Sequence, residues 1–410
     1  MAFIEFRHLY KIFGHKPQNA LSRLKEHPDD RESLLKTGHT AALRDITFSI
    51  ERGETFVVMG LSGSGKSTLV RCLNRLIEPT AGEILVDGQD VLALNNDELR
   101  ELRRQKMSMV FQRFALLPHR TVLENMAYGL EIQGLPKEER KERAMQWVDI
   151  VGLSGWENSY PRQLSGGMQQ RVGIGRALCT DSEILLMDEP FSALDPLIRR
   201  EMQDELLALE GRIHKTTVFI THDLDEALRL GDRIAILKDG LLIQVGTPEE
   251  ILSNPADDYV SDFTRDVNRI RVLSAGNVMI SPRPLVIDRG GPRAALEFMR
   301  KEGLSSVFVT NREMKLEGLL ALDEAIEAVK KGIKDVRDLL YRQEIQTASV
   351  DTGLEALLPS AIASRWPLAV VDDQNVLLGV IPRVAVLAAL AGDDSPKAAL
   401  AEQDVVLQQA

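Results

Sequence analysis

A glycine-rich loop between an apolar run and a helical stretch constrains the fold of this chain more than any other segment. Residues 60–67 read Gly-Leu-Ser-Gly-Ser-Gly-Lys-Ser, which fits the pattern G-x-x-x-x-G-K-[ST], and the apolar run 54–59 precedes them. The glycines let backbone N–H groups curl around phosphate oxygens without side-chain clashes, and the start of the next helix adds its positive end. The pattern therefore predicts a phosphate-binding loop between a strand and a helix.

Two side chains at the end of this loop predict how a nucleotide and its cation are held. Lys66 brings a positive charge to the phosphates, and the hydroxyl of Ser67 can coordinate Mg²⁺. The loop residues that we expect to bind the nucleotide are Gly60, Ser62, Gly63, Ser64, Gly65, Lys66, Ser67 and Thr68.

A second apolar run, 184–187, ends in two adjacent carboxylates, Asp188 and Glu189. At the end of a strand Asp188 can hold Mg²⁺ through water, and Glu189 can polarise an attacking water, since phosphoryl transfer depends mostly on positioning and charge neutralisation. Such a strand end is a weak signal alone. It becomes a strong one because it follows the loop at 60–67 in an α/β pattern.

The decisive segment is Leu-Ser-Gly-Gly-Met-Gln-Gln-Arg at residues 164–171. A serine and two glycines that open a helix form a second anion-binding helix start. The segment resembles the LSGGQ signature of the ABC ATPase family, with Met168 at the position of the motif's glutamine. In that family the two helix starts face different nucleotides, so the resemblance implies that two chains enclose two ATP molecules. The residues that it places on ATP are Ser165, Gly166, Gly167 and Gln169.

Further segments match the ABC ATPase motifs in the same order along the chain. The resemblance implies that Phe13, or Tyr10 as the alternative, stacks on adenine. It implies that Gln112 contacts Mg²⁺ and the membrane partner, that Asp195 lies in a loop crossing the dimer, and that His222 contacts the γ-phosphate. The implied catalytic residues are Glu189, His222 and Gln112, and the implied metal ligands are Ser67, Gln112 and Asp188.

The remaining periodicity predicts an α/β fold with a largely parallel core sheet. Apolar strands are expected at 107–111, 184–187, 217–220 and 233–237, with helices at 140–151, 167–179 and 196–211. The resemblance implies an ABC-type P-loop ATPase domain over residues 1–270. It contains a RecA-like core sheet, a helical subdomain at about 113–180 and a charged helical insertion at 14–40.

After about residue 275 a weak internal repeat indicates a second module. Val307 and Leu316 open strands whose counterparts, Ala369 and Leu377, follow 62 and 61 residues later. Each copy reads as strand–helix–strand–strand–helix. These tandem units resemble paired CBS domains, with boundaries at 275–338 and 339–392, followed by a flexible tail at 393–410.

Several stretches narrow the family to the ATP-binding subunits of glycine betaine/proline betaine importers. They are the insertion at 14–40, residues 59–66 through 74–80, residues 114–119 and residues 195–206. This resemblance implies ATP-driven, osmoregulated uptake of quaternary amines. It also implies a second copy of the chain, transmembrane permease subunits and, indirectly, an extracytoplasmic substrate-binding protein. The chain is then peripheral, on the cytoplasmic face of the bacterial inner membrane. Choline, carnitine and ectoine remain alternative solutes.

The ligand of the CBS pair stays open. The positions where nucleotide-binding copies carry Ser/Thr and then Asp read Ala321 and Glu324 in one copy and Pro382 and Ala385 in the other. Ordinary binding of AMP or ATP is therefore not expected, and the resemblance leaves an anionic lipid, a cyclic dinucleotide or neither. A basic run could serve permease docking, solvation or lipid binding; it consists of Arg100, Arg103, Arg104 and Lys106.

Composition and the motifs that are present or missing argue against other classes of function. A formal net charge of −11 argues against a nucleic-acid partner, which needs a basic face. The two cysteines, Cys72 and Cys179, have no metal-ligand spacing and read as packing residues in a reducing compartment. No signal peptide and no membrane-spanning run are visible. A ribosome- or DNA-directed ABC protein would carry a second loop like 60–67 or a coiled coil, and a non-hydrolysing nucleotide sensor would lack Glu189 or His222.

Overall fold

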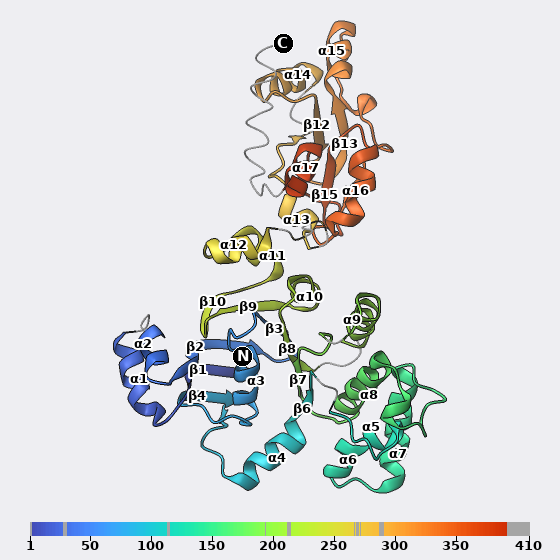
Figure 1. The fold of residues 1–410 in the computed structure, drawn as a ribbon. Helices are drawn as coiled ribbons and strands as arrows, with labels where there is room; N and C mark the ends of the chain where they lie inside the picture. The colour runs from blue at the N-terminus through green and yellow to red at the C-terminus, as the bar shows by residue number, and fades with distance from the viewer. Residues whose placement is uncertain are drawn as a thin grey trace. The chain divides into compact units, whose positions relative to one another are not determined.

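A computed structural model describes residues 2–27, 31–112, 115–192, 194–210, 215–265, 267, 270, 272–286 and 291–391. The chain forms two compact units, Met1–Thr264 and Arg265–Ala410 (Figure 1). The predicted tail at 393–410 lies outside the described residues, as do Phe114 and Ala193, each within a predicted motif.

A six-stranded sheet forms the centre of the first unit, in the order β10-β9-β3-β8-β7-β6. Five of its strands are parallel, and β10 is antiparallel to β9. Its strands are β3 (Thr55–Met59), β6 (Met107–Val110), β7 (Ile184–Asp188), β8 (Thr216–Thr221), β9 (Arg233–Lys238) and β10 (Leu241–Gly246). Every residue of β3, β7 and β8 is buried, which explains their unbroken apolar or Thr-rich sequences.

The register brings four strand ends to one level of the sheet. Met59 pairs with Thr221, Asp188 with Ile220, and Val110 with Met187. The next residues along the chain are therefore neighbours at the carboxyl edge, where open α/β sheets bind ligands. That edge carries the loop at 60–67, Gln112, Glu189 and His222.

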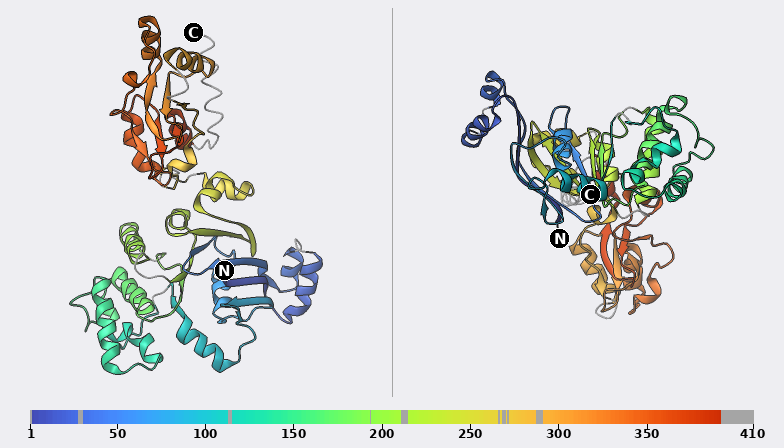
Figure 2. Two further views of the ribbon diagram at one scale, coloured as in Figure 1. Left: turned by 180° about the vertical axis from the view of Figure 1, so that it is seen from behind. Right: turned by 90° about the horizontal axis from the view of Figure 1, so that it is seen from below.

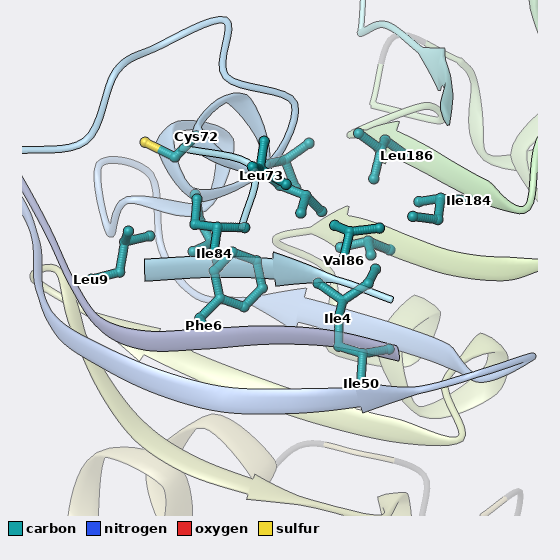
Figure 3. Packing of buried hydrophobic residues seen from close by; sticks show 14 of the residues in the cluster. Ile4, Phe6, Leu9, Ile50, Cys72, Leu73, Ile84, Val86, Ile184 and Leu186 are labelled. Atoms are coloured by element: carbon teal, nitrogen blue, oxygen red, sulfur yellow. The ribbon is translucent and has the colours of Figure 1, made fainter. Parts of the chain in front are cut away.

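An antiparallel sheet of order β2-β1-β4-β5 packs in the same core. Its strands are β1 (Ala2–Phe13), β2 (Thr40–Glu51), β4 (Ala81–Val86) and β5 (Gln89–Asp90). Figure 3 shows Ile4, Phe6, Ile84 and Val86 from this sheet beside Leu73 of α3 (Lys66–Leu73), all buried in one hydrophobic cluster. This packing fixes α3, and with it the loop at 60–67, on the sheets.

The predicted insertion forms two short helices, α1 (Pro17–Glu26) and α2 (Arg31–Lys36). Leu21, Leu24 and Leu34 from these helices are buried in one cluster with Tyr10 and Ile12 of β1. The insertion is therefore packed on the antiparallel sheet by its own small apolar core.

A group of helices lies beside the parallel sheet and has a hydrophobic cluster of its own (Figures 1 and 2). Its members are α5 (Val122–Met126), α6 (Tyr128–Ile132), α7 (Lys137–Ile150), η1 (Pro161–Gln163) and α8 (Gly166–Leu178). The other helices of the first unit are α4 (Asn96–Lys106), α9 (Pro196–Glu210), α10 (Leu224–Leu230), α11 (Pro248–Ser253) and α12 (Asp258–Thr264).

The second unit contains two three-stranded sheets with the same element order, as the sequence repeat predicts. After α13 (Ala275–Val278), the first copy comprises β11 (Leu285–Val286), α14 (Pro292–Lys301), β12 (Ser306–Thr310), β13 (Leu316–Ala321), α15 (Leu322–Lys331) and η3 (Arg337–Leu339). The second comprises β14 (Thr347–Ala348), α16 (Leu354–Ala363), β15 (Leu368–Val371), β16 (Leu377–Ile381) and α17 (Arg383–Ala391).

The two copies contact each other through matching positions. The Leu316 N–H donates to the Asn375 carbonyl, and the Leu377 N–H donates to the Met314 carbonyl, each at 2.9 Å. Because the partners in the second bond are the counterparts of those in the first, the copies are related by an approximate two-fold axis. One buried cluster, which contains Phe308, Leu319, Ala369 and Leu377, draws side chains from both copies.

Both cysteines are free and buried, as predicted for packing residues. Burial raises the pKa of Cys72 and of Cys179 to about 12, so neither thiol is reactive near neutral pH. Within the described ranges no helix combines the length and the apolar character needed to cross a bilayer.

Candidate nucleotide site

The loop at 60–67 has a backbone that only glycine fits at two positions. Gly60 and Gly65 have φ angles of 147° and 106°. A Cβ on Gly60 would lie 2.1 Å from the Leu237 carbonyl oxygen, and a Cβ on Gly65 would lie 2.3 Å from that of Ala42. The loop is therefore packed against the sheets by bare backbone, while Ser62 and Gly63 are exposed at its mouth.

Two polar groups in this loop fit an anion. The Ser64 hydroxyl is buried and, within the described structure, has no hydrogen-bond partner. The Lys66 ammonium, on a side chain only 4% exposed, donates to the carbonyls of Gly60 (2.8 Å) and Leu61 (3.1 Å). Burial lowers the pKa of Lys66, and the carboxylates of Glu189 and Asp188 act in the opposite direction. A phosphate oxygen would supply the missing partner of Ser64 and an anionic acceptor for Lys66.

Asp188 ends β7 as a buried carboxylate between two donors. The Ser67 hydroxyl donates to its Oδ1 at 2.8 Å, and Nη2 of Arg71 lies 3.2 Å from its Oδ2. A hydroxyl and a carboxylate this close are oxygen donors of the kind Mg²⁺ prefers. The predicted pair Ser67 and Asp188 is thus brought together from a helix start and a strand end.

Glu189 is the next residue, and its backbone is in the left-handed region with φ of 46°. Such strain in a non-glycine residue persists only where its surroundings enforce it, and it clusters at functional sites. The Glu189 carboxylate faces three predicted site residues: Nε2 of Gln112 donates to Oε2 at 3.1 Å, Nδ1 of His222 lies 3.6 Å from Oε2, and Nζ of Lys66 lies 3.9 Å from Oε1. Groups that follow three other strands, β3, β6 and β8, therefore converge on the carboxylate that follows β7.

Two residues join this cluster in roles that the sequence did not predict. Ser192 donates its hydroxyl to the Glu189 carbonyl at 3.0 Å and accepts from Gln112 at 3.4 Å. Arg71 adds the second donor to Asp188. A signal for Arg71 existed, since it follows Ser67 by four residues and side chains with that spacing share one face of a helix.

The second predicted helix start lies at the beginning of α8. The Ser165 hydroxyl accepts from the Met168 N–H at 3.3 Å and caps the helix, and Gln169 donates to the Leu164 carbonyl. Ser165 and Gly166 are exposed, and a Cβ added to Gly166 would have nothing within 4 Å. Among the described residues no hydrogen bond or ion pair joins this helix start to the cluster around Glu189.

The aromatic candidates differ sharply in exposure. Phe13, the last residue of β1, is 42% exposed, with Nζ of Lys11 4.8 Å from its ring centroid. Tyr10 is 9% exposed and belongs to the core under the insertion. Only Phe13 presents a ring face that a base could cover. Asp195 caps α9 by accepting from the N–H groups of Leu197 and Ile198.

The basic run on α4 is paired within the chain. Arg103 donates to the carbonyls of Asn74 and Arg75, just after α3. The other three side chains form ion pairs: Arg100 with Asp97, Arg104 with Glu101, and Lys106 with Asp87. These cations stabilise α4 and its contact with the end of α3.

Comparison with known proteins decides the family. A family model described as ABC transporter matches residues 43–192. The chain is 50% identical over 394 residues to the glycine betaine/carnitine transport ATP-binding protein GbuA of Listeria monocytogenes, covering 96% of this chain and 99% of that protein. The chain belongs to the ATP-binding subunits of ABC transporters. The predicted resemblance to this family is confirmed, and the chain is an ATPase subunit.

Other relatives of this ABC ATPase agree. It is 46% identical over 398 residues to the glycine betaine/proline betaine transport system ATP-binding protein ProV of Escherichia coli, covering 94% of this chain and 97% of that protein. Among solved structures, a dimeric post-hydrolysis state of the ATP-binding cassette MJ0796 bound to ADP and Pi matches with a TM-score of 0.51 and 33% identity, covering 60% of this chain and 98% of that one. The ABC-type α/β ATPase fold is thereby confirmed.

Proposed function

We propose that this ABC ATPase hydrolyses ATP to power uptake of glycine betaine, proline betaine or a related quaternary amine. The observation that carries the proposal is the similarity to GbuA and ProV, which extends along nearly the whole chain and includes the second unit. GbuA is named for transport of glycine betaine and carnitine, and ProV for transport of glycine betaine and proline betaine. The converging side chains of Lys66, Asp188 and Glu189 supply the chemistry.

The nucleotide lies at the carboxyl edge of the parallel sheet. Adenine stacks on Phe13, and the phosphates accept hydrogen bonds from the backbone of the loop at 60–67 and from Ser64, Lys66 and Thr68. Ser67, Asp188 and Gln112 would hold Mg²⁺, which would supply positive charge to the phosphate oxygens.

Glu189 orients the attacking water and accepts its proton. Water adds to the γ-phosphorus, the bond to the bridging oxygen breaks, and ADP leaves. Gln112 donates to the same carboxylate and positions it, and His222 donates to the γ-phosphate. The strained backbone of Glu189 supports this role, because it fixes the direction of the side chain.

A second copy of the chain completes each site. Ser165, Gly166, Gly167 and Gln169 of one chain bind the γ-phosphate held by the other, and Asp195 lies at the same interface. The exposure of this helix start supports the arrangement, as does the dimeric form of the MJ0796 cassette. Closure of the dimer drives transmembrane permease subunits, which receive solute from an extracytoplasmic binding protein. The chain acts on the cytoplasmic face of the inner membrane.

The domain boundaries that we propose are those predicted from the sequence. They are an ATPase domain at 1–270, with a helical subdomain at about 113–180, and two CBS units at 275–338 and 339–392. The repeated sheet order and the reciprocal hydrogen bonds between the copies support a CBS pair. Glu324, at a position where nucleotide-binding copies carry Asp, accepts from the Tyr341 hydroxyl at 3.0 Å. The Glu324 carboxylate is thus engaged within the chain, and the proposed regulator of the CBS pair is an anionic lipid, a cyclic dinucleotide or neither.

The experiment is ATPase activity of the transporter in liposomes, titrated with salt and with glycine betaine plus its binding protein. We expect turnover to rise with both. Indifference to glycine betaine, with a response to choline, carnitine or ectoine, would replace the solute. Indifference to salt would remove the regulatory role of residues 275–392.

A further inference from the structure

A buried carboxylate lies next to the loop that carries His222. Glu226, on α10, is 6% exposed. The Thr221 hydroxyl donates to its Oε2 at 2.6 Å, and Nε2 of Gln203 on α9 donates to its Oε1 at 3.0 Å. Thr221 immediately precedes His222, so Glu226 ties the His222 loop to α9.

Arg199 extends this network toward Leu194, just before α9. Its Nη2 lies 3.4 Å from the Leu194 carbonyl oxygen, and its Nη1 lies 3.4 Å from Oδ2 of Asp223. Its Nε lies 3.9 Å from Oε1 of Glu226, and this buried N–H has no hydrogen-bond partner in the described structure. The guanidinium thus connects Leu194 to the residues around His222. It contacts Asp223, which follows His222, and lies near Glu226, which binds Thr221 just before His222.

All three contacts are longer than the 2.7–3.2 Å that is usual for N–H···O bonds. The Arg199 side chain is 26% exposed, but its Nε–H is buried and, among the described residues, unpaired beside a carboxylate, so a small shift of α9 can give it a charge-assisted hydrogen bond. Asp195 caps α9 and, in the proposed dimer, lies at the contact with the second chain. Docking of that chain would therefore move the segment that Arg199 contacts.

We infer that Arg199 is a positioning residue for ATP hydrolysis, because it links Leu194 and Asp195 to the loop that carries His222. When a second chain docks on Asp195, the fork of Arg199 tightens on Asp223 and Glu226 and holds His222 at the γ-phosphate. The inference rests on the proposed role of His222. It adds a reason why hydrolysis awaits dimer closure.

The first test separates positioning from stability and from ATP affinity. In the assembled transporter, Arg199→Gln should lower kcat about tenfold or more while KM for ATP stays within about threefold. Arg200→Gln is the matched control, because Arg200 is an exposed neighbour on the same helix. Arg199→Lys keeps the charge and loses the fork, and should fall between wild type and Arg199→Gln. A kcat of Arg199→Gln equal to that of the control would overturn the inference.

The second test is a double-mutant cycle with His222→Ala. If Arg199 acts through His222, the double variant should be no slower than His222→Ala alone. If the double variant loses kcat by the product of the two single losses, the inference is overturned and the proposed site is unaffected. Full turnover of His222→Ala would instead overturn the proposed role of His222. Melting temperatures of all variants are compared with that of Arg200→Gln, and the cycle is run with Arg199→Lys if Arg199→Gln does not fold.

Discussion

The chain contains two glycine-rich helix starts of similar composition and opposite surroundings. The start of α3 is packed against backbone, with Lys66 buried at 4% exposure and the carboxylates of Asp188 and Glu189 close by. The start of α8 is exposed, with open space at Gly166 and no acidic residue in its first turn. The first site holds its own charged groups, while the second offers only backbone N–H groups and Ser165.

The charged groups and the exposure of each helix start indicate what each one contributes to the proposed site. A helix start with built-in cations and carboxylates can bind and activate a nucleotide. A bare, exposed helix start can only add hydrogen bonds to an anion that another surface brings to it. Under the proposed function, the α3 region determines ATP affinity and hydrolysis chemistry, and the α8 region determines whether hydrolysis requires a second chain.

The largest expected effect comes from Glu189→Gln, which removes the proposed catalytic base from the α3 region. We expect turnover to fall by at least about 100-fold while ATP affinity is kept, because the amide preserves the shape of the side chain but accepts no proton. Steady-state ATPase and equilibrium ATP binding measure the two quantities. Glu201→Gln, an exposed residue on α9, serves as the control. Near-normal turnover would assign the base elsewhere.

Lys66→Ala should have the next largest effect, which is a loss of ATP affinity. Loss of one charge-assisted contact of about 1.5–3 kcal/mol raises the Kd for ATP about 10- to 160-fold. Calorimetric titration of the full-length chain measures it, with the exposed Lys141→Ala as control. Unchanged affinity would contradict the phosphate contact.

Gly166→Asp breaks the α8 region alone. The new carboxylate has open space and suits a helix start, so the fold should hold, but it repels the phosphate brought by the other chain. Turnover should fall about tenfold with ATP affinity of the single chain unchanged. Gly353→Asp places the same group at the open start of α16 and should leave turnover normal. Weaker ATP binding by the single Gly166→Asp chain would contradict the claim that the α8 region acts only on a nucleotide held by the other chain.

The smallest expected effect is on the free energy of unfolding, at Lys215, which contacts the link between α8 and β7. Lys215 donates to the carbonyls of Thr180 and Ser182, in the link from α8 to β7, and burial lowers its pKa to about 8. The unfolded state, with a pKa near 10.5, binds more protons between those values, so stability rises with pH there and this gain is absent below about pH 8.

We expect wild type to gain about 1–2 kcal/mol relative to Lys215→Met between pH 8 and 10, after allowance for partial exposure. Urea unfolding followed by tryptophan fluorescence at several pH values measures the gain. The exposed Lys137→Met should follow wild type. Parallel curves for wild type and Lys215→Met would show that the ammonium is not desolvated.

The sequence predicted the elements of the parallel sheet closely because their signals are local. The run at 184–187 became β7, and the helix predicted at 196–211 became α9. It did not predict the antiparallel pairing of β1 with β4, which depends on segments far apart in the chain. Within the site, motif residues were predictable, whereas the Arg71 contact with Asp188 depends on how α3 packs on β7.

The most direct test of a site shared by two chains is to mix Glu189→Gln chains with Gly166→Asp chains and add ATP last. A dimer of either variant alone has no intact site. A mixed dimer has one intact site, built from the α3 region of the Gly166→Asp chain and the α8 region of the Glu189→Gln chain. With random pairing we predict single-turnover hydrolysis at about a quarter of the wild-type level. Hydrolysis no greater than the average of the separate variants would contradict the shared site.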